Sequence, residues 1–299
     1  MENKYIYLPQ YTVLKDKYKI ITNLSERSHF SIVYLAENDE EGKKVVIKEF
    51  YPPKLALRDL DQTTILPCQN HLEEKYTKER EKFLQEGKIL QNIECENICE
   101  CYEYFQENNT GYIVMKYYSG KTLEEYLNQG IMSFSRFFET IYFPLLKTVH
   151  KLHKKGYIHR DIKPQNVIMQ DSEPILLDFG SAINYEDKEY KNIAITPGFS
   201  PIELHSSSSN QGIYSDIYSL SSILYYFFTN KIPTPAKHRI IKDNIPGAKE
   251  LNSELSDYLN KVIMKNLSMN YRERDKSLFI YRMKLYLEYC RKKIKEKVL

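Results

Sequence analysis

The sequence predicts an α+β protein in which a small β-rich lobe is followed by a larger α-helical lobe. Short runs of β-branched and aromatic residues dominate the first third, at residues 18–21, 32–36 and 44–50. From Thr122 onward, most apolar residues recur at helical spacing. Because the strands come first and the helices follow, a small sheet lobe and a larger helical lobe are expected.

The expected elements follow the chain in order. In the first lobe, a turn at 40–42, a Pro-containing stretch at 51–71 and a helix at 72–91 precede two strands, 102–105 and 112–115. We expect the Pro-containing stretch to be a loop that covers the small lobe, the alternative being a docking surface beside the helix. In the second lobe, helices are expected at 123–127, 134–155, 216–229, 253–267 and 275–293, the last two being amphipathic.

Composition excludes several classes of protein. The 43 Lys and Arg nearly balance the 40 Asp and Glu, and the basic residues are not clustered as nucleic-acid binding requires. No apolar run approaches the ~18 residues of a membrane span, and the first residues do not resemble a secretory signal. The five cysteines lack zinc-site spacing, so we expect reduced, buried thiols and a cytoplasmic protein.

The run HRDIKPQN at residues 159–166 contains the residue types that phosphoryl transfer needs. Asp161 can accept the proton of an attacking hydroxyl, and Lys163 can neutralise the transferred phosphoryl group. Asn166 offers an amide oxygen to a metal ion. Asp178, which follows an apolar run and precedes a Phe-Gly turn, offers the second metal ligand.

These spacings resemble the protein kinase family, over residues 12–289. The resemblance implies a bilobal kinase fold with an N-lobe at 1–116, a hinge at 117–121, a C-lobe at 122–290 and a basic tail at 291–299. It implies that Lys48 binds the α- and β-phosphates of ATP and that Glu86 pairs with Lys48. It also places the gatekeeper and hinge, where adenine would bind, at Met115, Lys116 and Tyr118.

The resemblance continues in the second lobe. Residues 196–203 are similar to the substrate-positioning loop, in which Thr196 orients the catalytic loop and Glu203 pairs with Arg274. Asp216 would anchor the catalytic loop from below. The runs KEFYPP at 48–53 and ALRD at 56–59 resemble more narrowly a bacterial, eukaryotic-like subgroup of Ser/Thr kinases.

The phosphate-binding loop departs from the family pattern. Residues 24–33 contain no glycine, although G-x-G-x-x-G is expected between the first two strands. Alignment on Val33 puts Ser28 and Ser31 at two of the glycine positions, with Glu26 at the third. Alignment on Leu24 instead puts Ser25 and Arg27 at glycine positions. We therefore predict weaker or differently posed ATP binding, but not its absence.

These residues favour a Ser/Thr protein kinase that uses ATP with Mg²⁺ or Mn²⁺, phosphorylates protein hydroxyls and autophosphorylates. The alternative is a pseudokinase scaffold that binds nucleotide weakly, and a third hypothesis is a small-molecule kinase. Expected partners are protein substrates, and a homodimer or a regulatory partner is left open. The protein would act in a bacterial cytosol or be delivered into a host. The basic tail is expected to be a solvated helix end, the alternative being contact with acidic lipid or a partner.

Overall fold

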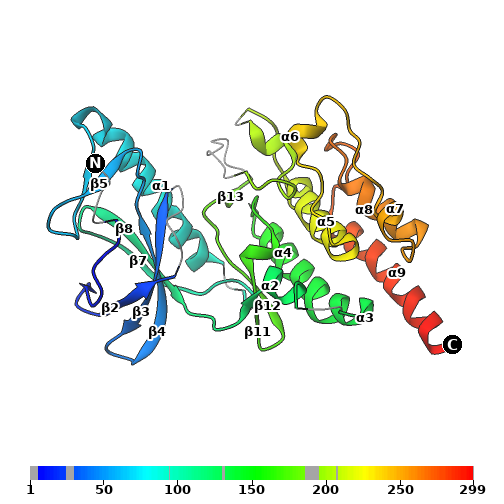
Figure 1. The fold of residues 1–299 in the computed structure, drawn as a ribbon, viewed down its shortest axis with the longest axis horizontal. Coiled ribbons are helices and arrows are strands. Elements are labelled where there is room, and N and C mark those ends of the chain that lie inside the picture. Colours follow the sequence, from blue (N-terminus) through cyan, green and yellow to red (C-terminus); the bar gives the residue numbers. More distant parts are fainter. Residues whose placement is uncertain are drawn as a thin grey trace. The chain divides into compact units, whose positions relative to one another are not determined.

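The computed structural model describes residues 6–24, 30–93, 95–129, 132–185, 195–206 and 208–298, which form two compact units (Figure 1). Unit 1 is assembled from Met1–Glu94 and Cys99–Ser119, and unit 2 from Cys95–Ile98 and Gly120–Leu299. The chain thus passes from unit 1 to unit 2 after Ser119. The lobe, hinge and tail boundaries inferred from the sequence stay predictions.

Unit 1 is built on a six-stranded antiparallel sheet in the order β1-β2-β3-β4-β8-β7 (Figure 1). The strands are β1 (Val13–Leu14), β2 (Tyr18–Asn23), β3 (Ser31–Asn38), β4 (Lys43–Phe50), β7 (Cys101–Glu107) and β8 (Thr110–Lys116). The expected strands are confirmed. Asn108 and Asn109, both at positive φ, form the two-residue turn between β7 and β8, as Asn tolerates this conformation.

A helix and a small hairpin complete unit 1. Helix α1 (Glu73–Asn92), preceded by a 3₁₀ turn η1 (Asn70–Leu72), packs on β7 and β8 and confirms the helix predicted at 72–91. The Pro-containing stretch forms the hairpin β5 (Ala56–Arg58) and β6 (Ile65–Pro67). Because Leu55, Ala56 and Ile65 belong to the core of the unit, this stretch covers the core as expected.

Unit 2 is mainly helical and confirms the order of helices read from the sequence. Its helices are α2 (Leu123–Leu127), α3 (Phe134–Phe137), α4 (Phe143–Lys154), α5 (Ile213–Thr229), α6 (Ala236–Arg239), α7 (Ala248–Leu251), α8 (Asp257–Asn266) and α9 (Leu278–Val298). The helix predicted at 134–155 is interrupted by a π turn, η2 (Phe138–Tyr142). Pro144 follows this turn at the start of α4, and its missing N–H cannot continue an α-helical hydrogen-bond ladder.

Short strands and turns place the loops of unit 2. Strand β11 (Val167–Gln170) pairs with β12 (Glu173–Leu176) on one side and β9 (Lys121–Thr122) on the other, while β10 (Tyr157–Ile158) pairs with β13 (Ile183–Asn184). The 3₁₀ turns are η3 (Pro164–Asn166) and η4 (Ile202–His205). Strands of two to four residues carry too little periodicity to be recognised from the sequence alone.

Two expectations from the sequence were wrong. The last helix, α9, does not present one apolar and one polar face, because large apolar side chains such as Ile280 and Leu287 are exposed while Tyr281 and Leu285 are buried. The cysteines are not all buried either, since Cys68 is exposed and Cys99 is buried, with the other three in between.

Candidate active site

A lysine and a glutamate form an ion pair inside unit 1. Lys48 lies in the middle strand β4, and its Nζ is 2.8 Å from Oε2 and 3.1 Å from Oε1 of Glu86 on α1. Both side chains are shielded, at 13% and 2% exposure. The adjacent Gly87 lets α1 approach the sheet, since a Cβ there would lie 2.8 Å from the Tyr104 side chain. The predicted pairing of Lys48 with Glu86 is confirmed.

The other residues expected near the nucleotide also belong to unit 1: Ser31, Val33, Met115, Lys116 and Tyr118. Val33 stands directly opposite Lys48 in the β3–β4 register, and Ser31 is buried at the start of β3. Glu100 holds the end of β8 and the segment after it, since its carbonyl accepts from the Lys116 N–H at 2.9 Å. The Glu100 N–H in turn donates to the Tyr118 hydroxyl at 3.3 Å. Ser28 lies outside the described residues.

The catalytic loop of unit 2 holds one carboxylate between three donors. The Asp161 Oδ2 accepts from Lys163 Nζ at 2.8 Å and from Asn166 Nδ2 at 2.9 Å. Its Oδ1 accepts from the Thr196 hydroxyl at 2.8 Å. Lys163 Nζ also donates to Thr196 Oγ1 at 3.0 Å. The four side chains therefore form one network, and Thr196 orients the loop as the sequence predicted.

Asp216, at the start of α5, anchors this loop from inside the unit. It is completely buried and accepts from the backbone N–H groups of His159 at 2.9 Å and Arg160 at 2.8 Å. His153 Nε2 lies 2.8 Å from the same carboxylate. Burial would raise the pKa of Asp216, but the hydrogen bond and charge of His153 and the contacts of His159 together hold that pKa below its usual value.

The catalytic loop contains a non-glycine residue, Arg160, in an unfavourable backbone conformation. Arg160 has a φ of 68°, and a non-glycine residue at positive φ persists only where its surroundings hold it. The two hydrogen bonds to Asp216 and those of the Arg160 guanidinium to the Ser181 carbonyl and to Gln211 supply that restraint. The predicted anchoring role of Asp216 is confirmed.

The β11–β12 hairpin brings the two expected metal ligands to one end. Val167 pairs with Leu176, and the Leu177 N–H donates to the Asn166 carbonyl at 2.8 Å, so Asn166 lies opposite Leu177, the residue before Asp178. Asn166 Nδ2 donates twice to Asp161, which directs the amide oxygen to the opposite side. Carboxylate and amide oxygens are hard donors that suit Mg²⁺ or Mn²⁺.

This donor set fits a metal ion that also binds phosphate. Among the described residues, no three His, Cys, Asp or Glu side chains gather as a metal site. Mg²⁺ typically binds one or two carboxylates and takes its other ligands from substrate phosphates and water. One carboxylate and one amide at the end of the hairpin are consistent with that mode.

A buried ion pair holds the substrate-positioning segment. Arg274 donates to both carboxylate oxygens of Glu203, at 2.6 and 3.1 Å, and both side chains are almost fully buried. The Ser215 hydroxyl donates to the same carboxylate at 2.9 Å. Nearer the catalytic loop, the Thr196 N–H donates to Ser200 Oγ at 2.9 Å. The predicted pairing of Glu203 with Arg274 is confirmed.

One buried charge cluster was not predicted. Glu49, next to Lys48 in β4, is fully buried and accepts from both guanidinium nitrogens of Arg58, at 3.1 and 2.6 Å. The hydroxyls of Tyr34 and Tyr112 donate to the same carboxylate at 2.8 and 3.0 Å. Because side chains alternate along a strand, Glu49 and Lys48 must face opposite sides of the sheet. The sequence therefore could have predicted that Glu49 lies away from the Lys48–Glu86 pair.

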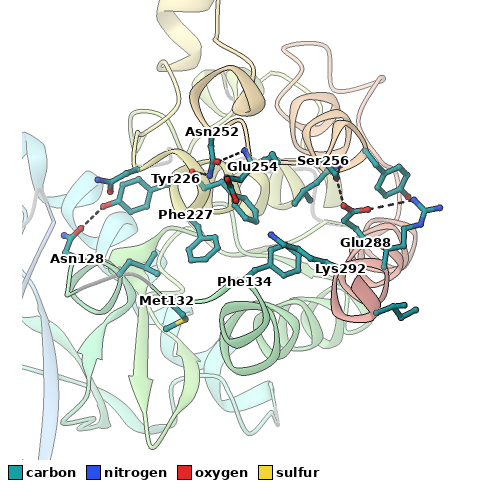
Figure 2. Close-up of a pocket in the computed structure, with 18 residues that line it drawn as sticks. Asn128, Met132, Phe134, Tyr226, Phe227, Asn252, Glu254, Ser256, Glu288 and Lys292 are labelled. Atoms are coloured by element: carbon teal, nitrogen blue, oxygen red, sulfur yellow. Dashed lines mark hydrogen bonds and ion pairs between the residues drawn. The ribbon is translucent and has the colours of Figure 1, made fainter. Parts of the chain in front are cut away.

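Figure 2 shows a pocket elsewhere in unit 2, with a volume of about 1180 Å³. Phe134 and Phe227 contribute to its apolar wall, and Asn252, Ser256 and Glu288 contribute polar groups. Lys292 extends over the Phe134 ring, with Nζ 4.4 Å from the ring centroid. None of the catalytic-loop residues lines this pocket, so we assign it no part in phosphoryl transfer.

The two units carry the parts of a phosphotransferase of the protein-kinase class. A β-rich unit holds a Lys–Glu pair, and a helical unit holds an aspartate in a catalytic loop with two metal-type donors beside it. The comparison with protein families agrees, since residues 27–278 match the protein kinase domain. The chain belongs to the protein kinase family and has its α+β fold.

Known bacterial kinases are among the proteins similar to this chain. The serine/threonine-protein kinase PknA of Nostoc sp. is 31% identical over 237 residues, which cover 74% of this chain and 38% of that protein. Serine/threonine-protein kinase D of Synechocystis sp. is 30% identical over 277 residues, which cover 87% of this chain and 50% of that protein. The chain thus spans half or less of the length of these relatives.

A solved structure supports the fold. The structure described as PpkA-294 apo form matches with a TM-score of 0.79 and 26% identity, over 94% of this chain and 99% of that one. As for membranes, the described part of the chain contains no helix with the length and apolar character needed to cross a bilayer.

Proposed function

We propose that the chain is a Ser/Thr protein kinase that transfers the γ-phosphate of ATP to protein hydroxyl groups, its own included. The observation that carries this proposal is the Asp161 carboxylate, which three donors hold in a fixed position inside the catalytic loop. A fixed carboxylate is what a reaction with little covalent chemistry requires, because positioning supplies much of its rate.

In this proposal Asp161 accepts the proton of the attacking hydroxyl, and Lys163 stabilises the charge on the phosphoryl group. Lys163 reaches both Asp161 and Thr196, so it lies beside the place where the hydroxyl would be deprotonated. A Lys two residues after the catalytic Asp is typical of kinases that act on Ser and Thr, which favours this substrate class over tyrosine.

The cofactors would be ATP and Mg²⁺ or Mn²⁺. Lys48, oriented by Glu86, would bind the α- and β-phosphates, and Asn166 with Asp178 would hold the metal ion. When bound, the metal ion supplies positive charge that neutralises the phosphate oxygens. The backbone at Met115, Lys116 and Tyr118 would bind adenine, and Ser28, Ser31 and Val33 would lie along the phosphates.

The weaker ATP binding predicted from the glycine-free loop stays a prediction, because residues 25–29 lie outside the described part of the chain. A scaffold without activity was the alternative drawn from the same loop. The ordered network around Asp161 gives that alternative no support, since a scaffold does not need these four polar side chains together.

The experiment is an incubation of the purified chain with γ-labelled ATP, Mg²⁺ and a generic protein substrate. We expect label transfer by the wild type and a rate lower by about 10²–10⁴-fold for Asp161→Asn. Asp171→Asn, the same change at an exposed aspartate of the β11–β12 turn, is the matched control and keeps wild-type activity. Absence of transfer from the wild type, with ATP still bound, would establish the scaffold instead.

A further inference from the structure

Helix α9 presents apolar side chains on two opposite faces. Its inner face, which includes Leu278, Tyr281 and Leu285, is buried against α4, α5 and α8. Its outer face displays large apolar side chains that are 40–64% exposed, namely Phe279, Ile280, Met283, Tyr286, Leu287 and Ile294. In Figure 1 this helix (red) follows α8 and ends at the C-terminus.

The outer residues form one continuous stripe. Ile280, Leu287 and Ile294 are seven residues apart, and Met283 lies between the first two, so all four share one side of the helix. The stripe from Phe279 to Ile294 extends over roughly 22 Å at 1.5 Å per residue. Single exposed apolar residues are common, but a contiguous apolar stripe marks a surface that binds something.

Positive charge borders the stripe on both sides. On one side, Lys284 lies four residues after Ile280 and Arg291 four residues after Leu287. On the other side, Arg282 and Lys293 are eleven residues apart and therefore lie along one line of the helix. Helix α9 contains seven Lys and Arg and two Glu, whereas the whole chain has a net charge of only +3. The rest of the chain is therefore slightly acidic, and the positive charge is concentrated in this helix.

Helix α4 extends the same positive surface. Lys147 and Lys154 are exposed on α4, which packs beside α9. Burial, and then the positive charges of Lys154 and Arg282, lower the pKa of His150 on α4, so that cations of both helices act on one imidazole. Lys154 of α4 and Arg282 of α9 therefore lie near the same imidazole.

Three of the border cations have acidic neighbours within the chain. Lys284 pairs with Asp275, Lys293 Nζ lies 2.6 Å from Glu139, and Arg291 lies 3.9 Å from Glu288. Only the Lys293–Glu139 pair is exposed on both sides, and such a pair is weak and exchanges readily. Lys284 is held by the buried Asp275, whereas the Arg291 side chain stays 63% exposed beside the buried Glu288. The one acid of residues 278–294, Glu288, is 8% exposed, so it puts little negative charge on the outer face.

We propose that the outer face of α9 binds the surface of a membrane that contains anionic lipids. An interfacial helix has this arrangement, with an apolar stripe at the acyl boundary and Lys and Arg beside it that reach the phosphates. The aromatic side chains of Phe279 and Tyr286 suit the interface as well. The bound helix would lie flat on the bilayer without crossing it.

Charge favours an anionic membrane over a second copy of the chain as the partner of this face. Two α9 stripes packed together would bring the basic borders of both copies into contact, and like charges so placed weaken association. A lipid surface with negative headgroups instead attracts each border cation. An acidic amphipathic helix of another protein would match the same charges, and binding to vesicles without any added protein distinguishes lipid from such a helix.

The test uses a single tryptophan as a reporter, because the chain contains none. Leu287→Trp places the indole in the stripe, and Ile241→Trp places it at a 98% exposed position distant in sequence from α9. Each variant is mixed with vesicles of phosphatidylcholine alone or with about one third phosphatidylglycerol, at low and high salt. Thermal unfolding confirms that each variant is folded.

We expect a blue-shifted emission for Leu287→Trp with anionic vesicles at low salt only, and no shift for Ile241→Trp. In the Leu287→Trp variant, replacement of Arg282, Arg291 and Lys293 by Gln should weaken binding to anionic vesicles by about fivefold per cation. Equal binding to neutral vesicles, or no shift with anionic ones, would overturn the proposal. A shift without vesicles, together with self-association in sedimentation velocity, would assign the face to a second copy. A shift only with an acidic amphipathic peptide would assign it to a protein partner.

Discussion

The hydroxyl of Thr196 donates a 2.8 Å hydrogen bond to Oδ1 of Asp161, across 35 residues of sequence. The same hydroxyl accepts from Lys163 Nζ at 3.0 Å, so it joins the proposed base to the proposed phosphate stabiliser. The substrate-positioning segment and the catalytic loop are thereby fastened to each other inside unit 2.

Removing this hydroxyl should slow phosphoryl transfer. Thr196→Val loses a hydrogen bond to a charged group, which is worth about 1.5–3 kcal/mol and corresponds to roughly 10- to 100-fold in kcat. Thr196→Ser keeps the hydroxyl and should retain most of the activity. Steady-state kinetics at varied ATP checks this prediction, and the KM for ATP should change little. Equal rates for Val and Ser would mean that the hydroxyl has no positioning role.

Breaking the Glu203–Arg274 pair should destabilise the protein. Arg274→Ala leaves the Glu203 carboxylate buried without its partner, at a cost of about 3–5 kcal/mol in the free energy of unfolding. Arg272→Ala, two residues away and exposed, is the matched control and should change stability very little. Urea unfolding measures both, and similar values for the two variants would contradict the structural role of the pair.

The buried Glu49–Arg58 pair allows a second stability test in unit 1. Arg58→Met alone should cost about 3–5 kcal/mol, because Glu49 then stays buried without its cation. Adding Glu49→Gln should recover a large part of that loss, because it removes the unpaired buried charge. The two Tyr hydroxyls bond different oxygens of Glu49, so one can donate to the Gln amide oxygen and the other can accept from the amide NH2. A double-mutant cycle by urea unfolding checks the coupling, and purely additive losses would argue against it.

Asp216 makes stability depend on pH. Its pKa is lower in the folded protein than the ordinary value of about 3.9, so its contribution is fully present above about pH 4 and is lost as the pH falls through the folded pKa. Asp216→Asn should therefore be less stable than wild type by about 2 kcal/mol at pH 7, and the gap should shrink below about pH 4.

Urea unfolding of wild type and Asp216→Asn between pH 3 and pH 7 measures this gap. The control is Asp257→Asn, because the Asp257 side chain is 91% exposed. The control should differ from wild type by the same small amount throughout the pH range. A gap for Asp216→Asn that widens toward low pH would contradict the lowered pKa.

The sequence predicted the site better than its surroundings. The partners of Lys48, Glu203 and the catalytic loop could be named because each belongs to a motif with fixed spacing, and the structure brings each pair together. The Glu49–Arg58 cluster was missed since a charged residue in a strand gives no sign of which partner will neutralise it. The π turn before Pro144 depends on local packing, which periodicity does not reveal.

The double apolar face of α9 was missed for a different reason. The helix is predicted correctly, but periodicity reports only that apolar residues recur, and a second apolar face beside Lys and Arg looks like an ordinary amphipathic pattern. Only burial, residue by residue, separates the face that packs on α4 and α8 from the face that is exposed.

Identification of the phosphorylated amino acids after reaction with γ-labelled ATP tests directly whether the chain is a Ser/Thr kinase. A kinase built around Asp161, Lys163 and Thr196 should yield labelled phosphoserine and phosphothreonine from the wild type, and almost no label from Asp161→Asn. Label on phosphotyrosine would rule out a Ser/Thr kinase, and equal label from wild type and Asp161→Asn would rule out Asp161 as the catalytic base.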